Sequence, residues 1–537
     1  MRSGWRWVGP AAVAAAIAIG VACGGGGSDR NESNVVPPDG GSGDGGAVDS
    51  GSAADAGAPD AGPDGGPTDG GSDAGVIIVP PTLGPGWTFY GTADGMPPNN
   101  VMGVTADEDG NIYVAGGDAG LFVQRGGRGS FRQYGIGDGL HPYGYLMGDM
   151  AKLKGVPDGS PSDPNPTLAA TPVVSVAGGK AGTVFVGYQG KPHCEEAWTW
   201  DQWSKPSAWG DPAVYKSGDA DKVTLAGDAL SVVHYDIFSG PGVVAAEPVG
   251  REKLCSIWRI VYQHGTNYLW FGGNHGFALG KADFAGNPTC NGQLGCAGVL
   301  EHVHPAFNDS AGNFVTEDYW GIAIDPLSQG GLHDVWFGGM ARTTRFRFGE
   351  TGGSYFDAEA RTEAWTKNNI NAPANAAFKA AYQNRLDVWS DGVGEYDAAG
   401  NPTFPTPAQW SAGLDLVSGI AADPADNSVY IASFGRGIRH LDHDGNFVGD
   451  LTAENKTLFA NNVSAIALDT DGSLWVGYKY EGGISRIHKG GVVEHYANVL
   501  GPQLEKSPVV DIQISPISPR KVFFAFQSGA VAVYEGN

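Results

Sequence analysis

The chain has 537 residues, a formal net charge of −25 and 41% hydrophobic residues, so it is long enough to form a large folded domain. An acidic surface repels phosphate backbones, which argues against nucleic acid as a partner. The composition is uneven, because residues 24–86 contain no aromatic side chain and every tryptophan except Trp5 and Trp7 lies at or beyond Trp87.

Residues 1–22 have the pattern of an export signal. Arg2 and Arg6 precede an apolar run that ends in small residues before Cys23, and the run is too short and too rich in alanine for a permanent transmembrane helix. The junction resembles the lipobox of bacterial lipoproteins, although Gly20 occupies a place where that family usually has leucine. The resemblance implies that Cys23 is lipidated and anchors the exported chain to the bacterial envelope, at the outer membrane, on its periplasmic or surface side.

Residues 23–86 are predicted to be a disordered tether. After Cys23 the segment is built of Gly, Ala, Asp, Ser and Pro, with ten acidic residues and Arg30 as its only basic residue. Such a composition cannot bury enough apolar surface to offset the entropy of ordering the chain. The folded domain is therefore expected to span residues 87–537.

A repeat runs through the folded domain. Residues 99–123 and 461–487 share the order Asn-Asn-Val, an alternating strand, Asp-x-Asp-Gly, an aromatic-Val strand, a Gly-rich segment and a third strand. Spacings of about 40–50 residues are typical of propeller blades. We count eight such units, whose second strands begin with an aromatic residue at Tyr113, Phe185, Trp270, Trp336, Trp389, Tyr430, Trp475 and Phe523.

The repeat predicts an all-β fold, a single β-propeller of seven or eight four-stranded blades. Short fourth strands are expected at 131–134 and 492–496. The last unit ends after its third strand, whereas the segment 87–90 precedes the first unit and reads as a fourth strand. We therefore expect residues 87–90 to complete the last blade and close the ring, because closure leaves only short sheet edges.

The segments 95–134 and 415–500 resemble the propeller repeat of two-component-regulator sensor regions. In that family Leu-Pro-x-Asn-x-Val precedes Asp-x-x-Gly-x-Leu-Trp-Val-Gly-Thr, and here "GMPPNNVMGVTADEDGNIYVAGG" has the same order. The resemblance implies an extracytoplasmic propeller and no enzymatic activity. The kinase and regulator domains of those proteins have no counterpart in this sequence.

The sequence "DEDGN" at 107–111 has two interpretations. It could begin a calcium-binding loop, but such a loop needs a glutamate at its twelfth position and flanking helices. Here the twelfth residue is Asp118 and strands flank the segment. We predict a tight turn, because Asp-Gly is a favoured turn pair.

Four further cysteines suggest disulfides in an exported protein. The predicted topology places Cys194 and Cys255 on one face of adjacent blades and directs Cys290 and Cys296 toward the other face. We predict the pairs Cys194–Cys255 and Cys290–Cys296. The sequence predicts no metal site and no cofactor, because no Cys-x-x-Cys pair or His-Glu-x-x-His motif occurs in it.

The face that carries the connections between second and third strands is the expected binding face. Its candidate residues are His275, Arg342, Arg436, Tyr480 and Glu481. An insertion at 188–230 in the second unit contributes four tryptophans, Trp198, Trp200, Trp203 and Trp209. These indoles either contact a ligand by stacking or form a small satellite core.

These features predict a membrane-tethered protein that binds a protein, peptide or glycan through this face. The folded domain contains no Gly-x-Ser-x-Gly motif and no nucleotide-binding loop, so no such motif indicates catalysis. Two alternatives stay open. One is a propeller enzyme of the lyase or lactonase kind with active groups at the central channel, and the other is a passive envelope spacer.

Overall fold

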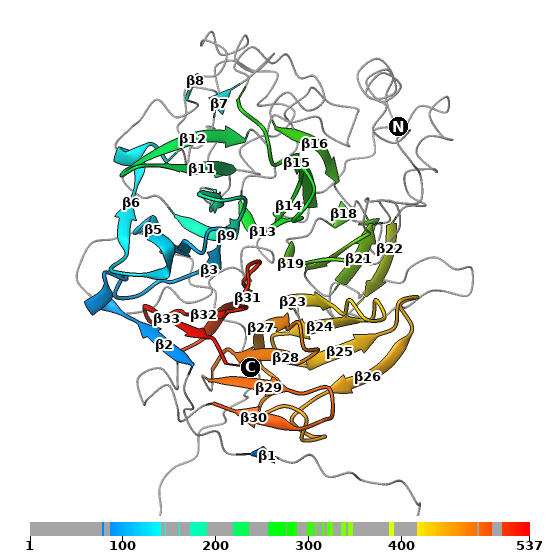
Figure 1. The fold of residues 1–537 in the computed structure, drawn as a ribbon. Coiled ribbons are helices and arrows are strands. Elements are labelled where there is room, and N and C mark those ends of the chain that lie inside the picture. The colour runs from blue at the N-terminus through cyan, green and yellow to red at the C-terminus, as the bar shows by residue number, and fades with distance from the viewer. Residues whose placement is uncertain are drawn as a thin grey trace, which may run out of the picture.

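The described strands of the chain form a β-propeller of seven blades around a central axis (Figure 1). A computed structural model describes residues 78–79, 86–140, 145–146, 160–161, 172–190, 218–235, 256–274, 276–286, 298–303, 307–308, 314–315, 319–325, 334–339, 342–346, 386–390, 416–480, 483–496 and 507–536. Each blade has four antiparallel strands, which confirms the predicted fold. Within these ranges no helix is long and apolar enough to span a bilayer.

Blades 1 to 4 follow one another along the chain. Blade 1 is β3 (Gly103–Ala106), β4 (Ile112–Ala115), β5 (Leu121–Gln124) and β6 (Arg132–Tyr134). Blade 2 is β9 (Val173–Gly178), β10 (Thr183–Tyr188), β11 (Ala220–Ala226) and β12 (Ala229–Tyr235). Blade 3 is β13 (Ile257–Tyr262), β14 (Tyr268–Gly273), β15 (Gly276–Lys281) and β16 (Val299–Val303). Blade 4 is β19 (Tyr319–Ile324), β20 (Val335–Gly339), β21 (Arg342–Phe346) and β22 (Leu386–Ser390).

Blades 5 to 7 complete the ring. Blade 5 is β23 (Val417–Ala422), β24 (Val429–Ser433), β25 (Gly437–Leu441) and β26 (Phe447–Leu451). Blade 6 is β27 (Val463–Leu468), β28 (Leu474–Tyr478), β29 (Ile484–Ile487) and β30 (Val493–His495). Blade 7 is β31 (Val509–Ile514), β32 (Val522–Phe526), β33 (Ala530–Tyr534) and β2 (Trp87–Tyr90).

Short elements lie outside this pattern. Two small hairpins pair β7 (Tyr145–Leu146) with β8 (Ser160–Pro161) and β17 (Phe307–Asn308) with β18 (Phe314–Val315). Three 3₁₀ turns are η3 (Thr92–Asp94), η4 (Arg125–Gly127) and η5 (Ile136–Asp138). The turns η3 and η5 precede blades 1 and 2, and in both an aspartate side chain accepts the N–H of the glycine three residues earlier.

One of the eight repeats counted from the sequence was identified wrongly. The unit at 378–397 is not a blade, because its strand β22 pairs with β21 as the fourth strand of blade 4. Trp389 lies in this outer strand and does not open a second strand. Second and fourth strands share the same alternation of two residues, so the aromatic residue alone could not distinguish them.

The turn at 107–111 is the predicted hairpin turn. The buried carboxylate of Asp107 accepts hydrogen bonds from the N–H groups of Asp109, Asn111 and Gly182, at 2.9, 3.0 and 2.9 Å. It also accepts the Nδ2 of Asn111 and the hydroxyl of Tyr113, each at 2.7 Å. Gly110 adopts a φ of 76°, which favours glycine. The Asp107 carboxylate therefore holds the turn together and links it to the neighbouring blade.

The same arrangement recurs in other blades. A polar residue that ends the first strand accepts a hydrogen bond from the aromatic residue that opens the second. Trp475 Nε1 donates to Asp469 at 2.8 Å in blade 6, as Tyr113 does to Asp107 in blade 1. In blades 4, 5 and 6 a cationic or imidazole side chain on the third strand packs on that aromatic ring, from Arg345, His440 and Arg486.

Small residues on the second strands let neighbouring blades pack closely. The residue two positions after the opening aromatic is glycine or alanine in all seven blades, as in Gly477. A Cβ atom at Gly477 would lie 2.5 Å from Val509 Cγ1 of blade 7, and one at Gly338 would lie 2.2 Å from Val417 Cγ1 of blade 5. The Trp-Val-Gly element of the repeat therefore sets the spacing between blades.

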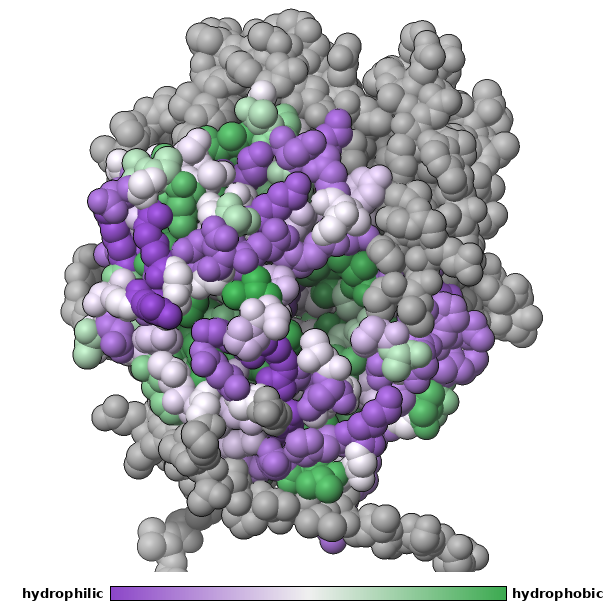
Figure 2. All heavy atoms as spheres, in the orientation of Figure 1, coloured by the Kyte–Doolittle hydropathy of each residue, from purple (hydrophilic) through white to green (hydrophobic). Residues whose placement is uncertain are grey.

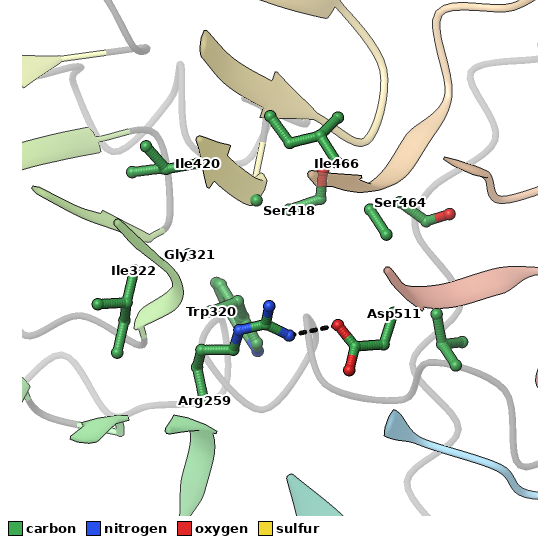
Figure 3. Close-up of a pocket in the computed structure, with 12 residues that line it drawn as sticks. Arg259, Trp320, Gly321, Ile322, Ser418, Ile420, Ser464, Ile466 and Asp511 are labelled. Atoms are coloured by element: carbon green, nitrogen blue, oxygen red, sulfur yellow. Dashed lines mark hydrogen bonds and ion pairs between the residues drawn. The ribbon is translucent and has the colours of Figure 1, made fainter. Parts of the chain in front are cut away.

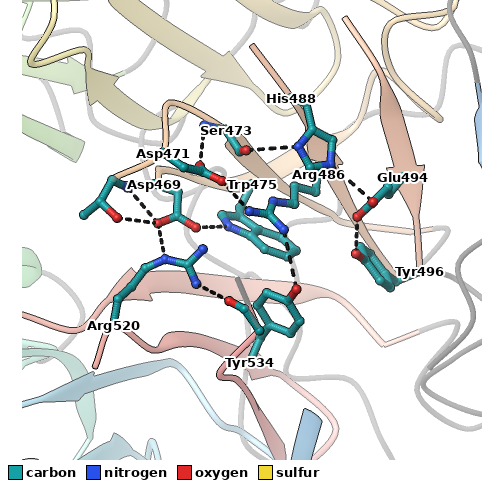
Figure 4. A network of polar contacts seen from close by, with 12 residues as sticks. Asp469, Asp471, Ser473, Trp475, Arg486, His488, Glu494, Tyr496, Arg520 and Tyr534 are labelled. Carbon is teal, nitrogen blue, oxygen red and sulfur yellow. Dashed lines mark hydrogen bonds and ion pairs between the residues drawn. The ribbon is translucent and has the colours of Figure 1, made fainter. Parts of the chain in front are cut away.

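The ring closes through β2, as the sequence predicted. Residues 87–90 pair with β33, so the two ends of the folded domain meet in blade 7. Trp87 packs on Tyr496, Phe524 and Tyr534, with ring centroids 4.8–5.5 Å apart. A polar network joins blades 6 and 7 beside it, with Arg520 Nε 2.6 Å from Asp469 and the Arg486 guanidinium over the Trp475 ring (Figure 4).

An additional strand lies before β2. β1 (Ile78–Val79) pairs in parallel with β30 of blade 6, at the register Ile78↔Val493. β1 therefore adds to the outer edge of blade 6, whereas β2 is itself the outer strand of the adjacent blade 7. The segment predicted as tether, 23–86, thus includes a short strand paired with the propeller.

Candidate binding site at the channel mouth

The inner strands share a β-bulge at the same height. In six blades the pairing between first and second strands skips one residue; the skipped residues are Val174, Trp258, Trp320, Ser418, Ser464 and Val510. Bulges re-aim side chains and are common beside functional sites. In blade 3 the bulge lies next to the turn that joins β14 to β15. The bulges therefore lie at the end of the channel that carries the connections between second and third strands.

The residues that follow the bulges form a ring of mostly small side chains. Each pairs with the glycine or alanine of the second strand, and the seven positions are Gly103, Ser175, Arg259, Gly321, Gly419, Ala465 and Asp511. Five of these positions hold glycine, alanine or serine. The two charged residues thus stand out against a background of minimal side chains.

Arg259 and Asp511 meet across the channel. Arg259 comes from blade 3 and Asp511 from blade 7, and Arg259 Nη1 lies 2.6 Å from Asp511 Oδ1 (Figure 3). Asp511 also accepts the N–H of Val104 at 3.1 Å and Gln513 Nε2 at 3.0 Å. The pocket around the pair encloses about 280 Å³ of empty space, part of it open to solvent. Figure 2 shows a hollow at the centre of the ring with apolar residues in its depth.

One tryptophan and two serines at bulge positions line this pocket. Trp320 lines it together with Ser418 and Ser464. The serine hydroxyls donate to the carbonyl oxygens of Val463 and Val509 on the next inner strand, at 2.7 and 2.6 Å. Each serine thus ties neighbouring blades together and keeps its oxygen as an acceptor. Trp258 is partly buried on the adjacent strand β13.

A second group of residues, the blade 5–6 patch, lies at the same end of the propeller. We define it as Phe434, Arg436, Phe459, Lys479 and Tyr480. Phe459 and Tyr480 are 51% and 52% exposed, and the Lys479 Nζ lies 4.8 and 5.0 Å from the rings of Phe434 and Tyr480. Arg436 is exposed on the β24–β25 turn, where its N–H donates to Ser433 Oγ. The patch joins cations and exposed rings on an otherwise acidic chain.

The buried side of this patch is packed against His495. Its ring stacks on Phe459 with centroids 4.0 Å apart, and its Nδ1 lies 3.0 Å from Ser485 Oγ. Burial of the imidazole disfavours its charged form and lowers the pKa of His495 to about 4. The ring under Phe459 is therefore neutral at physiological pH.

A buried polar cluster lies where the insertion of blade 2 joins strands β10 and β11. Tyr188 Oη donates to the Asp221 carboxylate, and His234 Nδ1 lies 2.7 Å from Asp221 Oδ1. His234 Nε2 is 3.6 Å from Asp219 Oδ2, and the side chains of His234 and both aspartates are at most 1% exposed. Because β11 begins at Ala220, the connection between the second and third strands runs over residues 189–219.

Only part of the predicted site falls on described residues. Arg436 and Tyr480 lie on neighbouring turns of blades 5 and 6, which Lys479 brings together. Arg342 is the first residue of β21, but its side chain is not among those that the structure describes. The other predicted site residues also lie outside the described residues; they are Trp198, Trp200, Trp203, Trp209, His275, Glu481, Cys23, Cys194, Cys255, Cys290 and Cys296.

Sequence reasoning missed Arg259, Asp511, Trp258, Trp320 and Phe459. A signal for the ion pair was present in the sequence. When the seven first strands are aligned on their aromatic partners, one position is Gly, Ser or Ala in five units and charged in two. Without the bulge register, that alignment was not evident.

No curated protein matches the chain significantly. Among solved structures, "YCF48 bound to D1 peptide" is similar over 86% of this chain and 98% of that chain, with 11% sequence identity and a TM-score of 0.42. The family model for the two component regulator propeller matches residues 457–480, across β27 and β28. This match confirms the resemblance of the chain to that repeat family.

Proposed function

We propose that the protein is an exported, lipid-anchored propeller that binds a protein or peptide through the blade 5–6 patch. The exposure of Phe459 and Tyr480 beside Lys479 and Arg436 carries the proposal. Aromatic and arginine side chains are enriched among the residues that dominate protein interfaces. The rings are stacked or paired with a cation, so little conformational entropy remains to be lost when a partner covers them.

The anchor and the disulfides belong to the same proposal. The signal pattern before Cys23 supports lipidation, and export supports the pairs Cys194–Cys255 and Cys290–Cys296. In a bacterium that expresses the chain, Cys23→Ala should move the protein from the membrane fraction to the soluble fraction. Mass spectrometry of the unreduced protein should recover the two cysteine pairs. A Cys23→Ala protein that stays with the membrane would refute the anchor.

The binding face is tested with matched aromatic variants of the full chain. Envelope proteins retained by the wild-type chain are identified and purified, and their dissociation constants are measured. Phe459→Ala with Tyr480→Ala should weaken the partner by about tenfold or more. Phe447→Ala is the control, because Phe447 is 57% exposed but lies on the outer strand β26. Equal loss in the control, or none in the double variant, contradicts the proposal. Capture of glycans instead of proteins would contradict its ligand class.

A further inference from the structure

The pocket at the channel mouth holds one cation with unused hydrogen-bond donors. Within the described part of the chain, Arg259 makes one hydrogen bond, from Nη1 to Asp511 Oδ1 at 2.6 Å. Its side chain is 25% exposed, and its guanidinium lies in the pocket (Figure 3). A guanidinium carries five N–H donors in a planar fork. Most of that fork is therefore left to solvent or to a ligand.

The carboxylate opposite Arg259 is already engaged. Asp511 is 4% exposed and accepts bonds from Arg259, Gln513 and the N–H of Val104. These three donors occupy the carboxylate oxygens without drawing in the rest of the Arg259 fork. The pair thus fixes the direction of the guanidinium and leaves its remaining edge open.

An aromatic side chain lines the pocket beside Arg259. Trp320 on the adjacent strand adds an apolar wall to the pocket.

We infer that this pocket binds the carboxylate group of a ligand, presented either by the end of a peptide chain or by an acidic sugar. A planar carboxylate matches the guanidinium fork, which can donate two parallel hydrogen bonds to it. A monoanion is favoured over a doubly charged phosphate, because Asp511 already balances the charge of Arg259. The small residues around the ring leave room for such a group and little more.

This inference rests on the proposed function, because the pocket and the blade 5–6 patch lie at the same end of the propeller. It adds the chemical group that the site recognises. The patch would hold the body of the ligand, and the pocket would hold its charged end. The two parts can be removed separately, because they share no residue.

The test uses two matched pairs of probes with the full-length chain. Acetyl-alanyl-alanine is compared with its carboxamide, and glucuronate is compared with glucose, by calorimetric titration at constant ionic strength. At least one acid should bind about tenfold or more tightly than its neutral partner. Preference for the peptide acid identifies a chain end, whereas preference for glucuronate identifies an acidic sugar and contradicts the protein or peptide class of the proposed function. Equal binding of acid and neutral probes, or no binding of either acid at about 10 mM, overturns the inference.

Variants assign the effect to Arg259. Arg259→Lys keeps the charge but removes the fork, so it should weaken the acid about tenfold. Arg128→Lys, the same change at an exposed arginine between β5 and β6, should have no effect. Melting temperatures show whether each variant is folded. Undiminished binding by folded Arg259→Lys overturns the inference. Unchanged partner binding in the Phe459→Ala, Tyr480→Ala variant, together with intact acid binding by the wild-type chain, refutes only the proposed function.

Discussion

Asp107 shows how one side chain can define a turn. Its carboxylate is fully buried and satisfies donors from its own hairpin and from Gly182 of the next blade. Asp109, two residues later, is exposed and contributes only its N–H group. The two aspartates of "DEDG" thus have different roles, although they look alike in the sequence.

Replacement of Asp107 tests this difference. Asp107→Ala should lower the free energy of unfolding by about 2–4 kcal/mol, because several buried donors lose their acceptor. Asp109→Ala is the matched control and should change it by no more than about 0.5 kcal/mol. Denaturant unfolding of the full chain measures both, with and without calcium. Equal effects of the two variants, or stabilisation by calcium that both abolish, would favour a metal loop.

His495 should make the fold sensitive to acid. Its pKa is about 4 in the folded protein, below its ordinary value of 6.5, because burial disfavours the imidazolium. A depressed pKa means that the stabilisation is present above pH 6.5 and is lost as the pH falls through 4. Denaturant unfolding at pH 7 and pH 4.5 should show less of this loss in His495→Gln than in wild type. His488→Gln, on the same blade, is the control. An unchanged pH dependence in His495→Gln would contradict the assignment.

At the scale of elements, the repeat could be recognised because an aromatic residue and a small residue two positions later recur in the second strand of every blade. This spacing predicted the inner strands and their order. The outer strands were harder to identify. They are short and lack that signature, and β22 in particular resembled a second strand because it contains Trp389.

The bulges could not be predicted from alternation alone. An extra residue changes which side chains face the channel, yet "VYIAS" and "VSGIAA" read as ordinary strands. Arg259 lay within a recognised repeat, but its partner is 252 residues away on a blade across the ring. Such a pair depends on closure of the whole ring, which no local window of sequence contains.

The spacing between blades can be tested at one glycine. Gly477→Ala should destabilise the protein by about 1–3 kcal/mol, because the new methyl group collides with Val509 across the blade interface. Gly490→Ala is the control, since a Cβ atom there meets nothing within 4 Å. Thermal unfolding compares the two variants. A neutral Gly477→Ala would show that blades 6 and 7 separate easily.

At the scale of the whole molecule, the ring depends on a strand from the other end of the folded domain. Trp87→Ala should cost about 2–3 kcal/mol, because the half-buried indole packs on three aromatic rings of blades 6 and 7. Phe89→Ala, on the same strand, should cost less than about 1 kcal/mol because Phe89 is 38% exposed. Unfolding should remain a single transition. Equal costs for the two variants would place the closing contacts elsewhere.

The pairing of β1 and β2 also determines the path of mechanical load. A pull on residues before Ile78 reaches the propeller first at the two-residue pairing of β1 with β30, and next at the longer pairing of β2 with β33. The first pairing has few hydrogen bonds to break, so β1 should detach at low force and lengthen the segment that precedes the propeller. The second should hold until blade 7 itself opens. The pocket at the channel mouth lies on the inner strands, away from this path. His495, which stacks on Phe459 of the blade 5–6 patch, lies on β30 itself. Tension before Ile78 would therefore reach the patch and leave the pocket undisturbed.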